Sequence, residues 1–107
     1  MPDEKTLFSK IIDGDLPGEF LYEDDRVVVI KDKYPDAPVH LLVIPRKPIP
    51  SIADMEPEDE PLVGHMIMIA KKMANDQNCK GYKLLFNVGE KGGQVIFHLH
   101  LHVMGWV

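Results

Sequence analysis

The sequence predicts an α+β protein whose five-stranded antiparallel meander sheet carries one short N-terminal helix and one long helix. Apolar and histidine side chains alternate from Phe97 to Val103, which is the period of a β-strand. From Pro57 to Asn75 the apolar residues recur every three or four positions, which is the period of an amphipathic helix. Because this helix interrupts a run of strands, we expect the helices on one face of the sheet, in a single domain over residues 1–107.

The remaining elements follow from shorter patterns. Apolar residues at helical spacing predict a short helix over residues 7–12, which ends before Gly14. Acidic residues 23–25 between two apolar runs favour a hairpin, and the glycine-rich segment 89–93 joins the last two strands. The predicted strands are the five segments rich in apolar and β-branched residues, 20–22, 26–31, 39–44, 82–87 and 95–104.

The last predicted strand carries the most specific feature of the chain. Three of the five histidines, His98, His100 and His102, stand there at two-residue spacing. Successive side chains of a strand point to opposite faces, so the three imidazoles would form one row. The apolar residues between them would point the other way, into a core; they are Phe97, Leu99, Leu101 and Val103.

Three interpretations of this row compete. The histidines could be the polar face of a half-exposed edge strand. They could bind zinc, because three protein ligands and a water form a catalytic zinc pattern, although the segment has no carboxylate companion. The third interpretation is nucleophilic and acid–base chemistry on phosphorus. The residues favour the third, because imidazole is a nucleophile near neutral pH and its ordinary pKa of about 6.5 lets neighbouring rings exchange protons.

The run His98-Leu99-His100-Leu101-His102-Val103-Met104 resembles the signature of the histidine triad superfamily, in which apolar residues separate three histidines. The likeness covers the chain from about Phe8 to Gly105. Other segments resemble the histidine triad nucleotide-binding (HINT) branch, in order and spacing: Glu23-Asp24-Asp25-Arg26, Asp32, residues 35–47, Gly81-Tyr82, Asn87 and Gly92-Gly93-Gln94.

The resemblance implies roles for four candidate catalytic histidines. His100 would attack the α-phosphorus and form a nucleotidyl intermediate, which water then hydrolyses. His98 would orient the site through its backbone carbonyl and through a contact with His40, and His102 would contact the phosphate oxygens or the leaving group. His40 follows a proline-restricted loop, and in the family the matching histidine lies beside the triad. His65, within the long helix, is expected to be structural.

The same resemblance implies a nucleoside pocket. Asp32 would accept hydrogen bonds from the ribose hydroxyls, and Asn87 with the backbone amides near Gly93 and Gln94 would hold the phosphate. Asn87 is also explained as a turn residue at a strand end. Four apolar residues match positions around the base and are equally explained as core: Phe8, Ile11, Ile30 and Leu42.

Two residues depart from the family pattern in this region. Lys33 stands where an apolar residue is usual, at the ribose edge of the pocket. Val95 stands where the branch often has a polar residue, frequently serine, that can reach the phosphate or the leaving atom. Valine can offer only its backbone N–H there. Relatives also usually continue for several residues beyond the position of Val107.

The resemblance, carried by these residues, implies a homodimeric purine nucleoside phosphoramidase, which needs no metal or organic cofactor. Its substrate would be a purine nucleoside 5'-phosphoramidate, and it would also bind the nucleoside monophosphate. Two alternatives remain, a dinucleoside polyphosphate hydrolase and a nucleotide-binding interaction module with minor catalytic activity. Substrate turnover would separate the phosphoramidase from the polyphosphate hydrolase, and the intact triad argues against the interaction module.

Composition limits the remaining classes. The formal net charge of −5 argues against a nucleic-acid groove, which needs a basic surface. The single Cys79 cannot form an internal disulfide and the start Met1-Pro2-Asp3-Glu4-Lys5 is no signal peptide, so a cytoplasmic location is expected. The apolar runs are too short to span a bilayer, so no membrane partner is expected.

Overall fold

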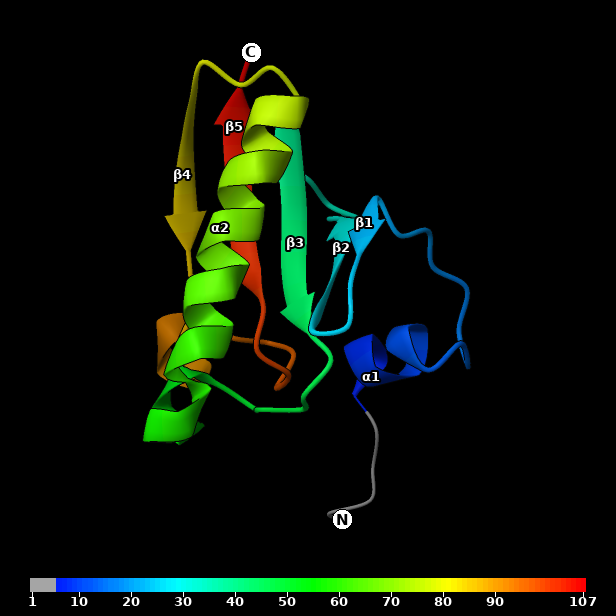
Figure 1. Cartoon of the computed structure of the whole chain (residues 1–107), viewed down its shortest axis with the longest axis vertical. Helices are drawn as coiled ribbons and strands as arrows, with labels where there is room; N and C mark the ends of the chain where they lie inside the picture. The colour runs from blue at the N-terminus through cyan, green and yellow to red at the C-terminus, as the bar shows by residue number, and fades with distance from the viewer. Residues whose placement is uncertain (1–5) are drawn as a thin grey trace.

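Five antiparallel strands form one sheet in the computed structural model, which describes residues 6–107 (Figure 1). The expectation about the first five residues therefore lies outside the described part of the chain. The strands are β1 (Tyr22–Glu23), β2 (Val27–Lys31), β3 (Val39–Pro45), β4 (Gly81–Leu85) and β5 (Leu101–Trp106). The helices are α1 (Leu7–Ile12) and α2 (Glu60–Asp76), with short 3-10 turns η1 (Ile52–Asp54), η2 (Pro57–Asp59) and η3 (Glu90–Gly92).

The predicted five-stranded antiparallel sheet and its two helices are confirmed, but the strand order is not that of a simple meander. The order is β1-β2-β3-β5-β4, so β5 lies between β3 and β4. The burial of the two strands agrees with this order. All five residues of β4 are exposed, whereas most residues of β5 are buried. The more apolar strand therefore takes the central position, and the more exposed strand takes the edge.

The two helices cover opposite faces of the sheet, so the expectation that they share one face is wrong. Val27 and Val29 of β2 belong to the core cluster under α2, whereas Val28 and Ile30 belong to the cluster under α1. Because neighbouring strand residues point to opposite faces, these clusters lie on the two sides of the sheet. Five buried residues of α2 complete the larger cluster: Met66, Ile69, Ala70, Met73 and Ala74.

The last predicted strand is shorter than expected at its start. It begins at Leu101, and residues 95–100 form an irregular segment. The ladder with β3 ends at the pair Val43 and Leu101, close to Pro45, which has no backbone N–H to donate. Leu99 N–H instead donates to the Ile49 carbonyl at 2.7 Å. The irregular path turns Phe97 outward, with 46% of its surface exposed, so the prediction that Phe97 enters the core is wrong.

Two further observations concern single elements. His65 of α2 is half-buried, and its Nε2 lies 2.7 Å from the Asp24 carboxylate, which fits the structural role expected for it. No helix within residues 6–107 is long and apolar enough to cross a membrane.

Candidate active site

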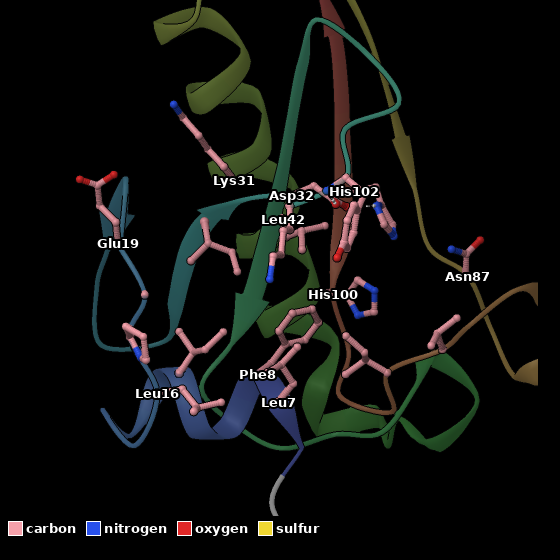
Figure 2. Close-up of a pocket in the computed structure, with 18 of the residues that line it drawn as sticks. Leu7, Phe8, Leu16, Glu19, Lys31, Asp32, Leu42, Asn87, His100 and His102 are labelled. Atoms are coloured by element: carbon pink, nitrogen blue, oxygen red, sulfur yellow. Dashed lines mark hydrogen bonds and ion pairs between the residues drawn. The ribbon is translucent and has the colours of Figure 1, made fainter.

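A cavity of about 710 Å³ opens between α1, the end of β2 and residues 98–102, the histidine segment (Figure 2). Leu7, Phe8 and Ile11 of α1 form its apolar end together with Ile30. His100 and His102 lie at the other end with Asp32 and Asn87, and Leu42 lies beside His102. The cavity therefore has an apolar part suited to a flat ring and a polar part suited to a charged group. All of these residues except Leu7 were predicted from the sequence.

His100 is held with one ring nitrogen free. Its Nδ1 lies 2.8 Å from the His98 carbonyl oxygen, which can only accept, so Nδ1 carries the proton. The Nε2 atom then keeps its lone pair. Burial lowers the pKa of His100 below the ordinary 6.5, so the ring is neutral near pH 7. A neutral imidazole with an unprotonated nitrogen is the nucleophilic form. The edge contact of Phe8, with ring centroids 4.9 Å apart, fixes the plane of this ring.

His40 and His102 form a second pair of rings, with 2.9 Å between His40 Nε2 and His102 Nδ1. The backbone N–H of Asp36 donates to His40 Nδ1 at 3.0 Å, so the proton of a neutral His40 lies on Nε2. That proton is donated to His102 Nδ1, which leaves the His102 proton on Nε2. Among residues 6–107, His102 Nε2 has no hydrogen-bond partner. His102 Nε2 is thus a buried N–H without a partner, on a ring that lines the cavity.

The protonation of His102 is also set by its surroundings. Burial, followed by the neighbouring His100 and His40, lowers the pKa of His102 to about 4. Asp32 opposes this shift from close by, because its Oδ2 lies 3.8 Å from His102 Nδ1 and 3.3 Å from His40 Nε2. The other carboxylate oxygen of Asp32 accepts the backbone N–H of Tyr34 at 2.9 Å. The carboxylate is thereby fixed between the histidine pair and the cavity.

Asp32, His40 and His102 could also be considered as a metal site, because one donor atom from each lies within 4.8 Å of the others. The hydrogen bonds argue against this. A histidine that binds a metal through one nitrogen normally donates the N–H of its other nitrogen. His40 does the opposite, because its Nδ1 accepts the Asp36 N–H and its Nε2 is protonated. The three residues are therefore arranged to hold protons rather than a cation.

His98 does not line the cavity, and the contact expected between it and His40 is wrong. Its side chain is 1% exposed. His98 Nε2 donates to the Pro45 carbonyl at 2.7 Å, and His98 Nδ1 accepts from the hydroxyls of Thr6 and Ser9 at 3.2 and 3.1 Å. Burial lowers the pKa of His98 below 6.5. The irregular segment before β5 turns this ring toward α1, so only the His98 carbonyl reaches His100.

The four apolar residues predicted around the base all line the cavity, and three of them also belong to the core. Phe8, Ile30 and Leu42 are buried in the cluster under α1, and Ile11 packs against it. These residues can therefore line a base pocket and belong to the core at the same time. Sequence reasoning missed four apolar lining residues, namely Leu7, Leu16, Pro17 and Ile96. Leu7 could have been found, because it lies one helical turn before Ile11.

The glycine-rich loop contributes less to the cavity than predicted. Gly93 lines it with a left-handed backbone (φ +91°), but its N–H donates to the Glu90 carbonyl. Gln94 is buried, its N–H donates to the Gly89 carbonyl, and its side chain donates to the Pro50 and Ile96 carbonyls. The predicted phosphate contacts of these two amides are therefore not available in this conformation. Gln94 instead ties the loop to the segment before η1.

Val95 and Asn87 remain at the polar end of the cavity. Val95 is 86% exposed, and its backbone N–H has no partner among residues 6–107. Figure 2 shows Asn87 on the far side of His100 from α1. Lys33 also lines the cavity, and its ammonium lies 6.0 Å from the ring centroid of Tyr34. The departure at Val95 thus leaves one free N–H and no side-chain donor.

Comparisons with known proteins agree over nearly the whole chain. A family model described as scavenger mRNA decapping enzyme C-term binding matches residues 5–107. An uncharacterized HIT-like protein of Synechocystis is 46% identical over 103 residues, which are 95% of this chain and 90% of that protein. The purine nucleoside phosphoramidase of Escherichia coli is 40% identical over 104 residues, which are 95% of this chain and 87% of that protein.

Solved structures give the same result. A HIT family hydrolase from Legionella pneumophila has a TM-score of 0.91 at 39% identity, with 96% of this chain and 94% of that chain covered. A HIT family hydrolase from Clostridium thermocellum has a TM-score of 0.92 at 40% identity, with 97% and 92% covered. The likeness to these hydrolases supports the same broad class for this protein, and the chain belongs to the histidine triad superfamily.

Proposed function

We propose that this protein is a purine nucleoside phosphoramidase of the HINT branch, which hydrolyses the P–N bond of nucleoside 5'-phosphoramidates through a nucleotidyl-His100 intermediate. One observation carries the proposal: the His98 carbonyl holds the proton of His100 on Nδ1, so Nε2 is the free nucleophile beside the cavity. The name of the Escherichia coli relative supports the choice of substrate class.

The cavity fits such a substrate from end to end. The purine would lie between Phe8, Ile11 and Ile30, which gain contact area when a flat apolar ring displaces water. The ribose hydroxyls would donate to Asp32. The phosphoryl group would then reach His100, with the N–H groups of Val95 and His102 and the amide of Asn87 as donors.

In the two chemical steps, the His40–His102 pair first gives up a proton and then takes one back. A bound phosphoryl anion favours the protonated form of nearby imidazoles, so the pair can hold one extra proton, stabilised by the Asp32 carboxylate. In the first step the bond from His100 Nε2 to phosphorus forms, the P–N bond breaks, and the amine leaves with that proton. In the second step water attacks phosphorus, the bond to His100 breaks, and the proton of the water returns to the pair.

Rapid quenching during turnover tests this proposal. We expect intact mass spectrometry to find one nucleotide on the protein, mapped to His100, and His100→Asn to abolish the adduct while nucleoside monophosphate still binds. Parallel assays should use adenosine phosphoramidate, guanosine phosphoramidate and diadenosine polyphosphates. Faster turnover of the polyphosphates would favour that hydrolase instead, and binding without any adduct would favour an interaction module.

We also propose that the chain forms a homodimer and works in the cytoplasm. The edge strand β4 exposes Tyr82, Leu84 and Leu85 on an unpaired edge, and α2 exposes Met68 with 58% of its surface accessible. Unpaired edges and exposed apolar groups favour pairing with another copy. Light scattering should give a dimer at micromolar concentration, and a monomer would contradict the proposed dimer.

The single Cys79, with no internal disulfide partner, suits the proposed location in a reducing cytoplasm.

A further inference from the structure

We infer that His98 is a positioning residue whose side chain ties α1, and with it the purine end of the cavity, to the segment that carries His100. This inference rests on the proposed function for its choice of ligand. It assigns no proton transfer to His98. The ring lies outside the cavity, and both of its nitrogens are bound to groups of the protein.

The bonds of His98 reach three separate parts of the chain. Nε2 donates to the carbonyl of Pro45, the last residue of β3, so the ring is anchored in the sheet. Nδ1 must then accept, and the hydroxyls of Thr6 and Ser9 are the donors. These two residues lie 92 and 89 positions away from His98 in the sequence. A single buried ring thus joins the start of α1 to β3 and to the histidine segment.

Helix α1 depends on such an attachment. It has six residues, and isolated helices shorter than about 12 residues are marginal in water. Phe8 is its only buried residue. Thr6 is the N-cap and accepts the N–H of Ser9, so the residue that starts the helix also donates to His98. Loss of the contact with His98 would therefore loosen the helix where it begins.

The same attachment connects α1 with the nucleophile. The His98 carbonyl accepts the Nδ1–H of His100, so a shift of residue 98 changes the orientation of that ring. Phe8 packs edge-on against both rings, with centroids 6.3 Å from His98 and 4.9 Å from His100. Figure 2 shows Leu7 and Phe8 rising from α1 toward His100. A purine held by α1 would therefore stabilise the attacking position of His100 through this attachment, an effect that a substrate without the base cannot use.

A core histidine that only stabilises the fold would act differently, and the difference can be measured. The variant is Thr6→Val combined with Ser9→Ala, which removes both hydroxyl donors and leaves the histidines intact. Its substrates are adenosine 5'-phosphoramidate and ribose 5'-phosphoramidate, which lacks the base. We expect kcat/KM to fall at least tenfold for the nucleoside substrate and at most twofold for the ribose substrate. Equal losses for the two substrates would overturn the inference.

Ser51→Ala provides the matched control. Ser51 is also an N-cap residue, and it is buried, but it starts η1, away from the cavity. This variant should lower thermal stability without separating the two substrates. If it separates them as strongly as the Thr6 and Ser9 variant does, the effect is general loosening, and the inference is overturned.

Binding experiments keep the inference testable if the proposed function fails. Absence of phosphoramidate turnover by the native protein would refute the proposed function alone. Calorimetry with adenosine monophosphate and ribose 5-phosphate would still apply, and we expect the double variant to lose at least tenfold affinity for the first only. In the adenosine monophosphate complex, nitrogen-15 NMR should show a smaller fraction of the Nδ1–H form of His100 for that variant than for the native protein. An unchanged tautomer, or equal loss of affinity for both ligands, would overturn the inference.

Discussion

Replacement of Val95 by serine should speed the hydrolysis of substrates with poor leaving groups. Val95 lines the polar end of the cavity beside His100 and offers no side-chain donor. A hydroxyl at this position could donate to the departing nitrogen or to a phosphoryl oxygen. Poor leaving groups need this assistance most, because more negative charge develops on the departing atom before it is protonated.

Exposure sets the size of this effect. A preorganised, buried donor of this kind is worth about 2.7–4 kcal/mol in the transition state. Val95 is 86% exposed, so water would compete with the new hydroxyl for the same acceptor. The usual net value of a hydrogen bond in water, about 0.5–1.5 kcal/mol, is therefore the better guide. It corresponds to an increase in rate of about twofold to tenfold.

Single-turnover measurements with a matched series of phosphoramidates test this prediction. Strongly basic amine leaving groups should gain the full factor in Val95→Ser, weakly basic ones should gain little, and nucleoside monophosphate affinity should stay nearly constant. Val95→Ala is the control for side-chain size. If the rates rise equally across the series, or not at all, the backbone N–H of Val95 and the Nε2–H of His102 already supply the assistance, and the reasoning about the hydroxyl is wrong.

Three more predictions follow from the protonation states in the structure. Activity should be unchanged after exhaustive chelation, because the protonated Nε2 of His40 has no lone pair for a metal; a loss that zinc restores would contradict this. The low-pH fall of kcat/KM should lie below the ordinary 6.5 of histidine, because burial lowers the pKa of His100, and a midpoint at or above 6.5 would refute the assignment. Burial raises the pKa of Asp24, but hydrogen bonds from Arg26, His65 and other neighbours outweigh this and lower it well below 3.8. The ionised carboxylate therefore adds stability above about pH 4, and this stability is lost as the pH falls toward the folded-state pKa. Asp24→Asn should cost about 1.5–3 kcal/mol at pH 7 and less at pH 3 in urea titrations, and a constant difference would exclude the carboxylate as the cause.

Local patterns predict those parts of the fold that depend on neighbouring residues. The periodic spacing in α2 and the apolar runs of β2 and β3 identify these elements to within a few residues. They do not show that α1 and α2 lie on opposite faces, because every residue from Val27 to Ile30 is buried and no polar face marks one side. The position of β5 inside the sheet is also a long-range choice, made by the relative burial of β4 and β5.

In the candidate site, too, local patterns predict some histidine positions but not those that depend on distant residues. Their spacing predicts that His100 and His102 reach one cavity, and the resemblance adds Asp32, His40 and Asn87, all of which lie near it. The different direction of His98 depends on Pro45, which ends the ladder with β5, and on two hydroxyls in α1. Neither cause lies near His98 in the sequence.

The four histidines are chemically alike, so their separate roles must come from the backbone groups that hold them. The Pro45 carbonyl fixes the proton of His98 on Nε2, and the His98 carbonyl fixes the proton of His100 on Nδ1. The Asp36 N–H fixes the proton of His40 on Nε2, and His40 then sets His102. Carbonyls and N–H groups cannot exchange roles as donor and acceptor, so each tautomer lasts as long as the fold around it. In the proposed mechanism this division leaves one ring as a nucleophile, one as a proton donor and one as a tie to α1, which a repeated histidine motif could not produce by itself.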